Sequence, residues 1–505
     1  MPLFLGLDVG TQGTKGLLVD AERRAVVARA SSSYDLIAGL PPGAAEQHPA
    51  TWIDAVRDVA RELLAAPGVE AGRVAGVGVS GQQHGLVVLD ARGEVVRPAK
   101  LWCDTSTANE ARELSAAFGH AVPAGFTAPK VAWLARHEPE SWARTRSVLL
   151  PHDYVNFRLT GAKTMEAGDA SGTGFFDPEA RAFHPGEVAR TDPRLAECLP
   201  PLLATGAAAG ALDAAGAELL GLRPGVPVAA GGGDNMLSAV GSGATRPGVV
   251  VVSLGTSGTV FAYAERPVVD PEGCIAPFCG SVGGWLPLLC VMNVTGVTEE
   301  VRAAFGSTHA ELTAAAEAVP PGCGGLTWVP YLVGERVPNL PEAAGSLLGM
   351  RPGHLAPGVL YRAALEGTSL NLGWGVDRMR RLGIDASEVR LVGGAARNPL
   401  WRAILADVLG CPVVRLAEPE SAALGAALQA LWTVRRAAGE DVSADEVAAP
   451  FVRTDGEPAL PDPARVRAYA ELAASFRERV GALYSSCNRR AASSSDSSVA
   501  RQKSS

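Results

Sequence analysis

Two stretches decide the fold: LDVGTQGTKGLLVDAERRAVV, residues 7–27, and VSLGTSGTVFAYAERPVV, residues 252–269. Each contains an apolar strand, a Gly-Thr turn, a second turn of small residues and another apolar strand. About half of the chain separates them. A repeat at this spacing predicts two domains of like topology that face one cleft, and ligands commonly bind at such an interface.

The pattern outside the repeat alternates strands with amphipathic helices. A short strand is predicted over 74–81, and helices are predicted over 49–66, 360–383 and 419–439, where apolar residues recur at helical spacing. Residues 389–410 indicate a strand, a glycine turn and another helix. These elements together predict an α/β protein.

Composition excludes several classes of function. The chain has 505 residues, enough for more than one domain, and 47% of them are hydrophobic. Its net charge of −8 argues against a nucleic-acid partner. We expect no membrane segment and a cytoplasmic protein, because no signal peptide opens the sequence and no apolar run reaches membrane-spanning length. The eight cysteines form no CxxC pair, so buried free thiols are expected rather than a zinc site.

The stretch GGGDNM, residues 231–236, places Asp234 directly after three glycines. Gly and Asp are ordinary turn residues, which is one interpretation. The other is chemical, because a carboxylate at a strand end can take a proton from a bound substrate.

Three glycine-rich turns are candidates for nucleotide binding. DVGTQGTK (8–15) and SLGTSGT (253–259) offer backbone N–H groups and small hydroxyls to a phosphate, and Asp8 at the first strand end suits a magnesium ion. Neither is a Walker A loop, and each alone is also compatible with a simple hairpin. The turn in LVGGAARN (391–398) suits either a flat ligand such as adenine or close packing of a helix on a strand.

Two loops place polar groups after apolar strands, SGQQHG (80–85) and LWCDTST (101–107). Side chains that both donate and accept hydrogen bonds suit sugar hydroxyls. A structural role is the alternative, above all for His84, and Trp102 suits the wall of a pocket.

In their shared order these motifs resemble the FGGY family of carbohydrate kinases. The resemblance also covers GFTAPK (125–130), LLPHDY (149–154), DASGTGFFD (169–177), VPYLVGERVP (329–338) and ESAALGAA (420–427). It implies the two-domain actin/Hsp70/hexokinase-like ATPase fold, with ribonuclease H-like domains around a central cleft. The implied division is an N-terminal domain over 1–242, a C-terminal domain over 243–484 and a Ser-rich disordered tail over 485–505.

The resemblance implies ATP-dependent phosphorylation of D-xylulose to D-xylulose 5-phosphate, with ATP and Mg²⁺ bound. GFTAPK, LLPHDY and GQQHG favour this sugar within the family. The alternatives are a kinase of another ketose or polyol (ribulose, a tetritol or glycerol), a non-catalytic sugar sensor and a chaperone-type ATPase. The last two are disfavoured because we find neither a DNA-binding segment nor a peptide-binding domain in the sequence. A homodimer is also implied.

The resemblance gives each matched position a role. Asp234 is the implied general base, and Asp8 and Asp234 are the implied magnesium ligands. Phosphate contacts are implied for Gly10, Thr11, Gln12, Thr14, Lys15, Gly255, Thr256 and Ser257, and adenosine contacts for Gly393, Gly394 and Asn398. The implied sugar pocket consists of Gln83, His84, Trp102, Asp104 and Asn235.

Three residues depart from the usual family pattern. Gln83 replaces Met in GQMHG, Cys103 replaces Asn in LWND, and Ala395 replaces Gly in GGGAR. The first two lie in the implied sugar pocket, so they bear on which sugar is preferred.

Overall fold

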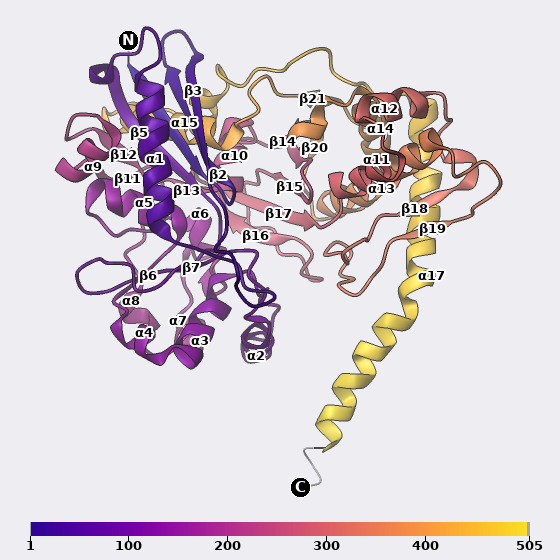
Figure 1. Cartoon of the computed structure of the whole chain (residues 1–505), viewed down its shortest axis with the longest axis horizontal. Coiled ribbons are helices and arrows are strands. Elements are labelled where there is room, and N and C mark those ends of the chain that lie inside the picture. Colours follow the sequence, from indigo (N-terminus) through magenta and orange to yellow (C-terminus); the bar gives the residue numbers. More distant parts are fainter. Residues whose placement is uncertain (1, 502–505) are drawn as a thin grey trace.

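The computed structural model describes residues 2–501, with side chains described through Tyr484, and consists of two α/β lobes (Figure 1). The first lobe contains a seven-stranded sheet with the order β11-β12-β5-β1-β2-β3, and β13 also pairs with β5. Its strands are β1 (Leu3–Val9), β2 (Gly13–Asp20), β3 (Ala25–Ser33), β5 (Val74–Gly81), β11 (Ala208–Ala211), β12 (Pro227–Ala229) and β13 (Gly232–Gly233).

The second lobe contains a six-stranded sheet with the order β16-β17-β15-β14-β20-β21. Its strands are β14 (Gly248–Ser253), β15 (Gly258–Ala262), β16 (Ala276–Cys279), β17 (Trp285–Val291), β20 (Ala386–Val392) and β21 (Val413–Arg415).

The two sheets repeat one topology. In the first, β1 pairs antiparallel with β2, β2 pairs antiparallel with β3, and β5 lies parallel to β1. In the second, β14, β15 and β17 form the same antiparallel series, and β20 lies parallel to β14. The Gly-Thr turns join β1 to β2 and β14 to β15, so the predicted repeat and the predicted two-domain ATPase fold are confirmed.

Shorter strands form two-stranded sheets: β4 (Glu46–Gln47) with β7 (Ala99–Lys100), β6 (Val87–Leu89) with β8 (Ser147–Leu149), β9 (Phe176–Asp177) with β10 (Ala182–Phe183), and β18 (Thr327–Val329) with β19 (Ser346–Leu348). The helices are α1 (Pro49–Leu64), α2 (Ala108–Phe118), α3 (Thr127–His137), α4 (Pro139–Arg144), α5 (Pro151–Thr160), α6 (Ala167–Ala170), α7 (Pro185–Thr191), α8 (Leu195–Cys198), α9 (Ala214–Leu220), α10 (Asp234–Gly241), α11 (Thr295–Phe305), α12 (His309–Glu317), α13 (Pro357–Arg381), α14 (Pro399–Leu409), α15 (Ser421–Ala437), α16 (Ala444–Ala448) and α17 (Pro463–Arg501).

Helix α15 comes late in the sequence but packs on the first sheet, against β1, β5 and α10. Small residues make this contact possible, because a Cβ at Gly78 would lie 1.9 Å from the carbonyl oxygen of Ala426. One segment of the C-terminal half therefore packs as part of the first lobe, and the predicted boundary between residues 242 and 243 stays a prediction.

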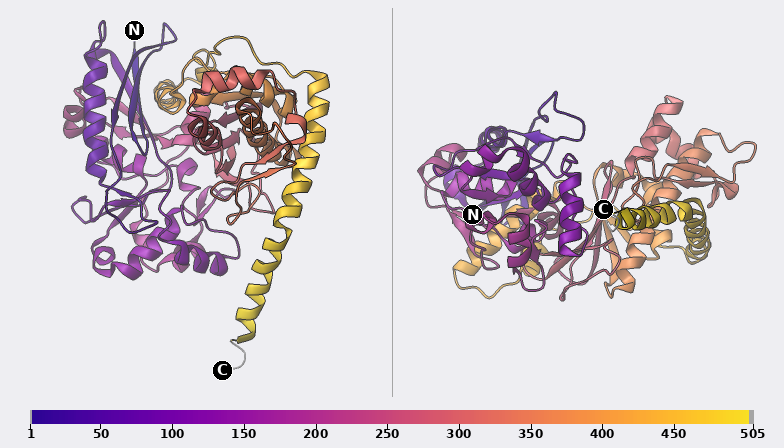
Figure 2. Two further views of the ribbon diagram at one scale, coloured as in Figure 1. Left: turned by 45° about the vertical axis from the view of Figure 1, so that its right-hand side comes forward. Right: turned by 90° about the horizontal axis from the view of Figure 1, so that it is seen from below.

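Helix α17 packs on α13 and α14 and runs along the outside of the second lobe (Figure 2). It continues to Arg501, whereas the sequence predicts a disordered tail from residue 485. The side chains of 485–501 and all of 502–505 lie outside the described part, so the tail stays a prediction.

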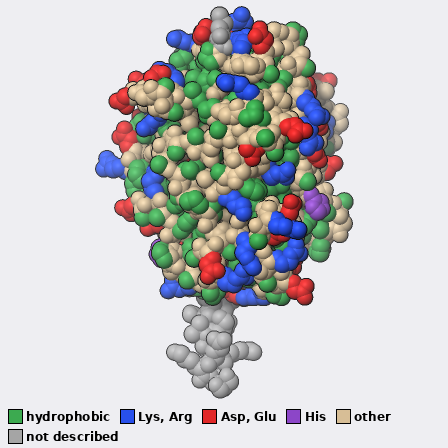
Figure 3. Space-filling model, turned by 90° about the vertical axis from the view of Figure 1, so that its left-hand side faces the viewer, with side chains coloured by type: hydrophobic (Ala, Val, Ile, Leu, Met, Phe, Trp, Pro, Cys, Tyr) green, Lys and Arg blue, Asp and Glu red, His purple; other side chains and the backbone are tan. Residues whose placement is uncertain are grey.

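Acidic and basic side chains both occur over the face of the first lobe drawn in Figure 3. Across the residues that the structure describes, none of the helices has the length and apolar character needed to cross a membrane. The seven cysteines in the described part of the chain are free thiols, as predicted, but only four of them are buried, because Cys103, Cys274 and Cys290 are partly exposed. Cys487 lies among the undescribed side chains.

Candidate active site

Asp234 is the first residue of α10 and follows β13 directly. Its Oδ1 accepts hydrogen bonds from the backbone N–H of Asn235 at 2.8 Å and from Asn235 Nδ2 at 2.9 Å. Burial and the nearby charge of Asp8 raise the pKa of Asp234 to about 7, against the effect of these hydrogen bonds. A carboxyl group with this pKa is suited to accept a proton near neutral pH.

Asp8 lies near the carboxyl end of β1, where it pairs in register with Lys15 of β2 and Ser80 of β5. Ser80 is also paired with Gly232 of β13, so these strand ends meet at one edge of the sheet. Ser80 Oγ donates to Asp8 Oδ1 at 2.8 Å. Burial raises the pKa of Asp8, while this hydrogen bond and the Lys15 charge act against the rise.

The glycines before Asp234 lie against neighbouring atoms. Gly231 has a φ of +80°, and a Cβ there would lie 2.6 Å from the carbonyl oxygen of Val79. A Cβ at Gly233 would lie 2.6 Å from Gln83 Cγ and 3.1 Å from Asp169 Oδ1. Close packing therefore explains why glycines precede Asp234. The sequence alone was compatible with either an ordinary turn or a catalytic carboxylate at this point.

The first Gly-Thr turn is joined to both predicted sugar loops. Thr11 Oγ1 accepts from Trp102 Nε1 at 2.9 Å and donates to Gln82 Oε1 at 3.0 Å. The carbonyl of Gly10 accepts from the Tyr34 hydroxyl at 2.8 Å. The phosphate turn and the predicted sugar pocket are thus adjacent.

The remaining predicted residues of this turn lie on or beside β2. The backbone carbonyl of Gln12 accepts from the backbone N–H of Tyr34 at 3.2 Å, and the Thr14 and Tyr34 hydroxyls are 3.3 Å apart. Lys15 forms an ion pair with Glu420 at 2.6 Å, which links β2 to the residue before α15.

The second Gly-Thr turn lies beside the start of α11. The carbonyls of Gly255 and Thr256 accept from the backbone N–H groups of Thr295 and Val294, at 2.9 and 3.0 Å. Ser257 completes the turn into β15. Beyond it, Thr259 Oγ1 donates to Asn235 Oδ1 at 3.0 Å, so strand β15 of the second lobe contacts the residue after Asp234.

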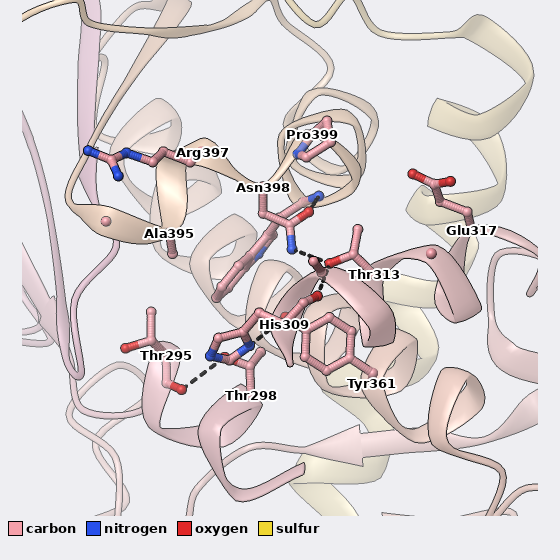
Figure 4. A pocket seen from close by; sticks show the side chains of 14 residues that line it. Thr295, Thr298, His309, Thr313, Glu317, Tyr361, Ala395, Arg397, Asn398 and Pro399 are labelled. Atoms are coloured by element: carbon pink, nitrogen blue, oxygen red, sulfur yellow. Dashed lines mark hydrogen bonds between the residues drawn. The ribbon is translucent and has the colours of Figure 1, made fainter. Parts of the chain in front are cut away.

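A pocket of about 610 Å³ opens next to this turn in the second lobe (Figure 4). Asn398 Nδ2 donates to Thr313 Oγ1 at 2.9 Å, and His309 Nδ1 lies 3.0 Å from the Tyr361 hydroxyl. The lining combines apolar and polar groups: Thr295, Thr298, His309, Ala310, Thr313, Ala314, Glu317, Tyr361, Gly394, Ala395, Arg397, Asn398, Pro399 and Trp401.

Of the predicted adenosine residues, Gly394 and Asn398 line this pocket. Gly393 lies behind them, where its Cβ would be 2.7 Å from the carbonyl oxygen of Leu254, the residue before the second turn. Thr295 both lines the pocket and bonds to that turn, so pocket and turn form one continuous surface. A nucleotide could occupy both.

Gln83 and Asn235 bond to each other. Asn235 Nδ2 donates to Gln83 Oε1 at 2.8 Å as well as to Asp234. Asp104 is fully buried: its Oδ2 accepts from Ala45 N at 2.9 Å and Lys100 Nζ at 3.1 Å. Its position supports the loop that carries Trp102, and its predicted contact with sugar stays a prediction.

His84 has a φ of +62°, and its ring packs against Phe126 and Phe278, with centroids 4.6 and 5.8 Å away. Burial and the Lys130 charge lower the pKa of His84 to about 3, so its ring is neutral at pH 7. Lys130 Nζ donates to the His84 carbonyl at 3.0 Å and fixes this unusual backbone conformation.

Sequence reasoning gave no role to three buried charged residues beneath the site, His152, Asp169 and Lys130. His152 Nδ1 lies 2.8 Å from Asp169 Oδ2, with both side chains fully buried. All three lie in motifs that resemble the family, LLPHDY, DASGTGFFD and GFTAPK. A short stretch of sequence does not show which distant residues will be in contact after folding, so these contacts could not be predicted.

The described residues contain no group of three or more His, Cys, Asp or Glu side chains able to hold a metal ion. Mg²⁺ needs fewer, because it is usually bound by one or two carboxylates together with substrate phosphates and water. Asp8 and Asp234 provide hard oxygen donors, and the negative charge of Asp8 raises the pKa of Asp234. These two residues fit a magnesium ion.

Two lobes of like topology, a carboxylate at a helix start and a pocket beside a Gly-Thr turn define a sugar-kinase type of ATPase fold. The chain belongs to the FGGY family of carbohydrate kinases: the model of the family's N-terminal domain matches residues 3–241, and that of its C-terminal domain matches 250–434.

Individual relatives match over most of their length. The chain is 39% identical to the xylulose kinase of Haemophilus influenzae (85% of this chain, 90% of the relative) and 41% identical to that of Streptomyces coelicolor (88% and 90%). The crystal structure of xylulose kinase from Rhodospirillum rubrum superposes with a TM-score of 0.85 at 32% identity, covering 96% of this chain and 99% of that one.

Proposed function

We propose that the protein transfers the γ-phosphoryl group of ATP to D-xylulose, giving D-xylulose 5-phosphate and ADP. The observation that carries the proposal is the geometry of Asp234. Asn235 occupies its Oδ1, and no described residue donates a hydrogen bond to Oδ2. Family membership supports sugar phosphorylation, and the xylulose kinases at 39–41% identity support the choice of sugar.

Asp234 acts as the general base. The primary hydroxyl of the sugar has a pKa far above neutrality, so its oxygen becomes a good nucleophile only as its proton leaves. Oδ2 takes that proton while the oxygen attacks the γ-phosphorus in line and ADP leaves. The pKa of about 7 makes Asp234 a stronger base than an ordinary aspartate.

The nucleotide occupies the pocket and both turns. Its adenosine contacts Gly393, Gly394 and Asn398. Its phosphates contact the backbone and hydroxyls of the two Gly-Thr turns, residues 10–15 and 255–257, where small side chains leave the N–H groups accessible. The continuity between Thr295, the second turn and the pocket supports this path.

The sugar lies in the first lobe, between the phosphate turn and the loops of Gln83, His84, Trp102, Asp104 and Asn235. Thr11 bonds directly to Trp102, which supports placing the sugar beside the γ-phosphate. Asp8 and Asp234 would hold Mg²⁺, an ion that neutralises phosphate charge when bound.

The test is ADP release from Mg·ATP, coupled to NADH oxidation, with D-xylulose beside D-ribulose, L-ribulose, a tetritol, glycerol and gluconate. We expect D-xylulose to give the highest kcat/KM. A higher value with another sugar would contradict the proposed substrate and point to Gln83 and Cys103 as the cause.

The predicted homodimer and cytoplasmic location remain proposals with separate tests. Light scattering coupled to gel filtration measures the mass of the particle against the 52.0 kDa chain. Fractionation of cells measures the compartment.

A further inference from the structure

A buried ion-pair network lies beneath the glycine turn that leads to Asp234. His152 is between two carboxylates, with Nδ1 2.8 Å from Asp169 Oδ2 and Nε2 3.0 Å from Asp153 Oδ1. The three side chains are at most 2% exposed. Although burial alone would lower it, the two carboxylates raise the pKa of His152 well above its usual value.

Two buried polar atoms beside Gly233, Asp169 Oδ1 and Gln83 Nε2, have no hydrogen-bond partner among the described residues. His152 Nε2 likewise has only its ion-pair contact with Asp153 and no hydrogen bond within that part of the chain. An ideal Cβ on Gly233 would lie 3.0 Å from Gln83 Cδ and 3.1 Å from Asp169 Oδ1, so both side chains lie beside this glycine. One atom is an acceptor and the other a donor, and they are complementary.

Gln83 connects the network to Asp234. Its Oε1 accepts from Asn235 Nδ2 at 2.8 Å, and the same Nδ2 donates to Asp234 Oδ1 at 2.9 Å. Thr259 Oγ1 donates to Asn235 Oδ1 at 3.0 Å. If the Gln83 amide were flipped, two NH₂ groups would face each other, so the orientation of Gln83 decides whether Asn235 is held.

We infer that Asp169 is a positioning residue for phosphoryl transfer, an inference that rests on the proposed function. In the working enzyme its carboxylate accepts from Gln83 Nε2, the donor that lies without a partner beside it, and so fixes the orientation of that amide. Gln83 then holds Asn235, which engages Oδ1 of Asp234 and directs Oδ2 toward the sugar hydroxyl. His152 and Asp153 keep the Asp169 carboxylate in place.

A purely structural ion pair makes a different prediction. If Asp169 only stabilised His152, its loss would lower stability whatever residue occupied position 83. If it acts through Gln83, its effect on kcat disappears once Gln83 has no amide. Residues that share one hydrogen-bond network are non-additive in this way, whereas independent residues are additive.

The experiment is a double-mutant cycle of Asp169→Ala and Gln83→Met, measured with D-xylulose and Mg·ATP. Met has nearly the length of Gln but no amide. We expect each single variant to lower kcat about tenfold, the size associated with one lost hydrogen bond, with the KM for ATP changed less than about twofold because the nucleotide pocket is untouched. The double variant should equal the Gln83→Met single variant.

Asp169→Asn is the conservative variant, because its amide oxygen can still accept from Gln83 Nε2. It should restore most of the kcat that Asp169→Ala loses. The matched control is Asp407→Asn, which removes the charge of a buried aspartate paired with the half-exposed Arg465 in the second lobe and should leave kcat unchanged. Thermal melting identifies folded variants, and Asp169→Leu, which keeps the branching at Cγ but has no hydrogen-bond acceptor, replaces the alanine variant if that one does not fold.

Additive losses of kcat in the cycle, or equal losses for Asp169→Asn and Asp169→Ala, would overturn the positioning role. Wild-type preference for another sugar of the panel would instead contradict the proposed substrate, and the same cycle is then measured with that sugar. The two failures are therefore distinguishable.

Discussion

Asn235 donates two hydrogen bonds to a single oxygen of Asp234, from its backbone N–H at 2.8 Å and from Nδ2 at 2.9 Å. Both bonds reach Oδ1, so they fix the rotation of the carboxylate while Oδ2 receives no hydrogen bond from the described residues. The position at the first residue of α10 also places this negative charge at the positive end of a helix dipole. The site thus holds one oxygen and leaves the other for chemistry.

The first prediction concerns that oxygen. Asp234→Ala should lower kcat by about a hundred- to ten-thousand-fold, the usual contribution of a general base. Folding should be mostly intact, because Asp234 is the half-buried first residue of α10 and is not part of its apolar face, and because loss of a desolvated carboxylate removes no packing contact of that face. The coupled ADP assay measures kcat, and circular dichroism measures folding.

Asp213→Asn is the matched control for this variant. Asp213 also lies at a helix start in the first lobe, where it accepts from Gly216 N at 2.8 Å, and it has no place in the proposed site. Its kcat should equal that of the wild type. Near-normal turnover by Asp234→Ala would refute the assignment of the base.

The two-lobe fold could be predicted because its evidence is local. Strands β1 and β14 end in the same Gly-Thr turn, and each is followed by an apolar strand, so the repeat is visible in short windows of sequence. Asp234 was found in the same way, from a carboxylate placed directly after a glycine run. Family motifs then supplied the roles.

The contacts that hold Asp234 could not be predicted, because they join distant parts of the chain. Asn235 meets Gln83 and Thr259, which lie 152 and 24 residues away. The pocket wall comes from α12 and α13, where His309 and Tyr361 look like ordinary helix residues in the sequence. Only the packing of α13 on α12 brings them together.

The second prediction tests the nucleotide pocket by filling it. Gly394 lines the pocket, and a Cβ built on it has no heavy atom within 4 Å, so a side chain fits there without strain in the protein. Gly394→Leu should leave folding intact and occupy space that adenosine requires. We expect the KM for ATP to rise at least about tenfold, the usual effect of a lost well-packed contact, with little change in the KM for the sugar.

Gly72→Leu is its control. Gly72 lies in the first lobe, and its Cβ also meets open space, but it does not line the nucleotide pocket. Steady-state kinetics with ATP and sugar varied in turn separate the two KM values. An unchanged KM for ATP in Gly394→Leu would exclude adenosine from this pocket.

The third prediction uses the buried carboxyl group of Glu166, which caps α6 by accepting from the backbone N–H groups of Gly168 and Asp169 at 2.6 and 2.5 Å. Burial raises the pKa of Glu166 from 4.5 to about 7, against the charge of His152 and these hydrogen bonds. Between those pH values the folded protein holds a proton that the unfolded chain has lost. The free energy of unfolding therefore falls as pH rises from 4.5 to 7.

Glu166→Gln removes this titration. Relative to wild type, the variant should gain up to about 3 kcal/mol of stability between pH 4.5 and 7 and no more above it. Urea unfolding of both proteins at several pH values measures the difference.

Glu446→Gln is the control. Hydrogen bonds from Ser443 lower the pKa of Glu446, so the difference in free energy of unfolding between this variant and the wild type should stay flat from pH 5 to 8. A flat curve for Glu166→Gln would contradict the raised pKa.

The last prediction is that the lobes close on their ligands. Parts of the proposed site belong to both lobes: the sugar loops and Asp234 to the first, the adenosine pocket and the second Gly-Thr turn to the second. In-line transfer requires these parts to meet, and closure excludes water that would hydrolyse ATP. Small-angle X-ray scattering with D-xylulose and a non-hydrolysable ATP analogue together should show a smaller radius of gyration than the free protein.

Gly394→Leu, in which the nucleotide is excluded, should not compact under the same conditions. An unchanged radius of gyration for the wild type with both ligands at saturation would contradict the predicted closure of the lobes.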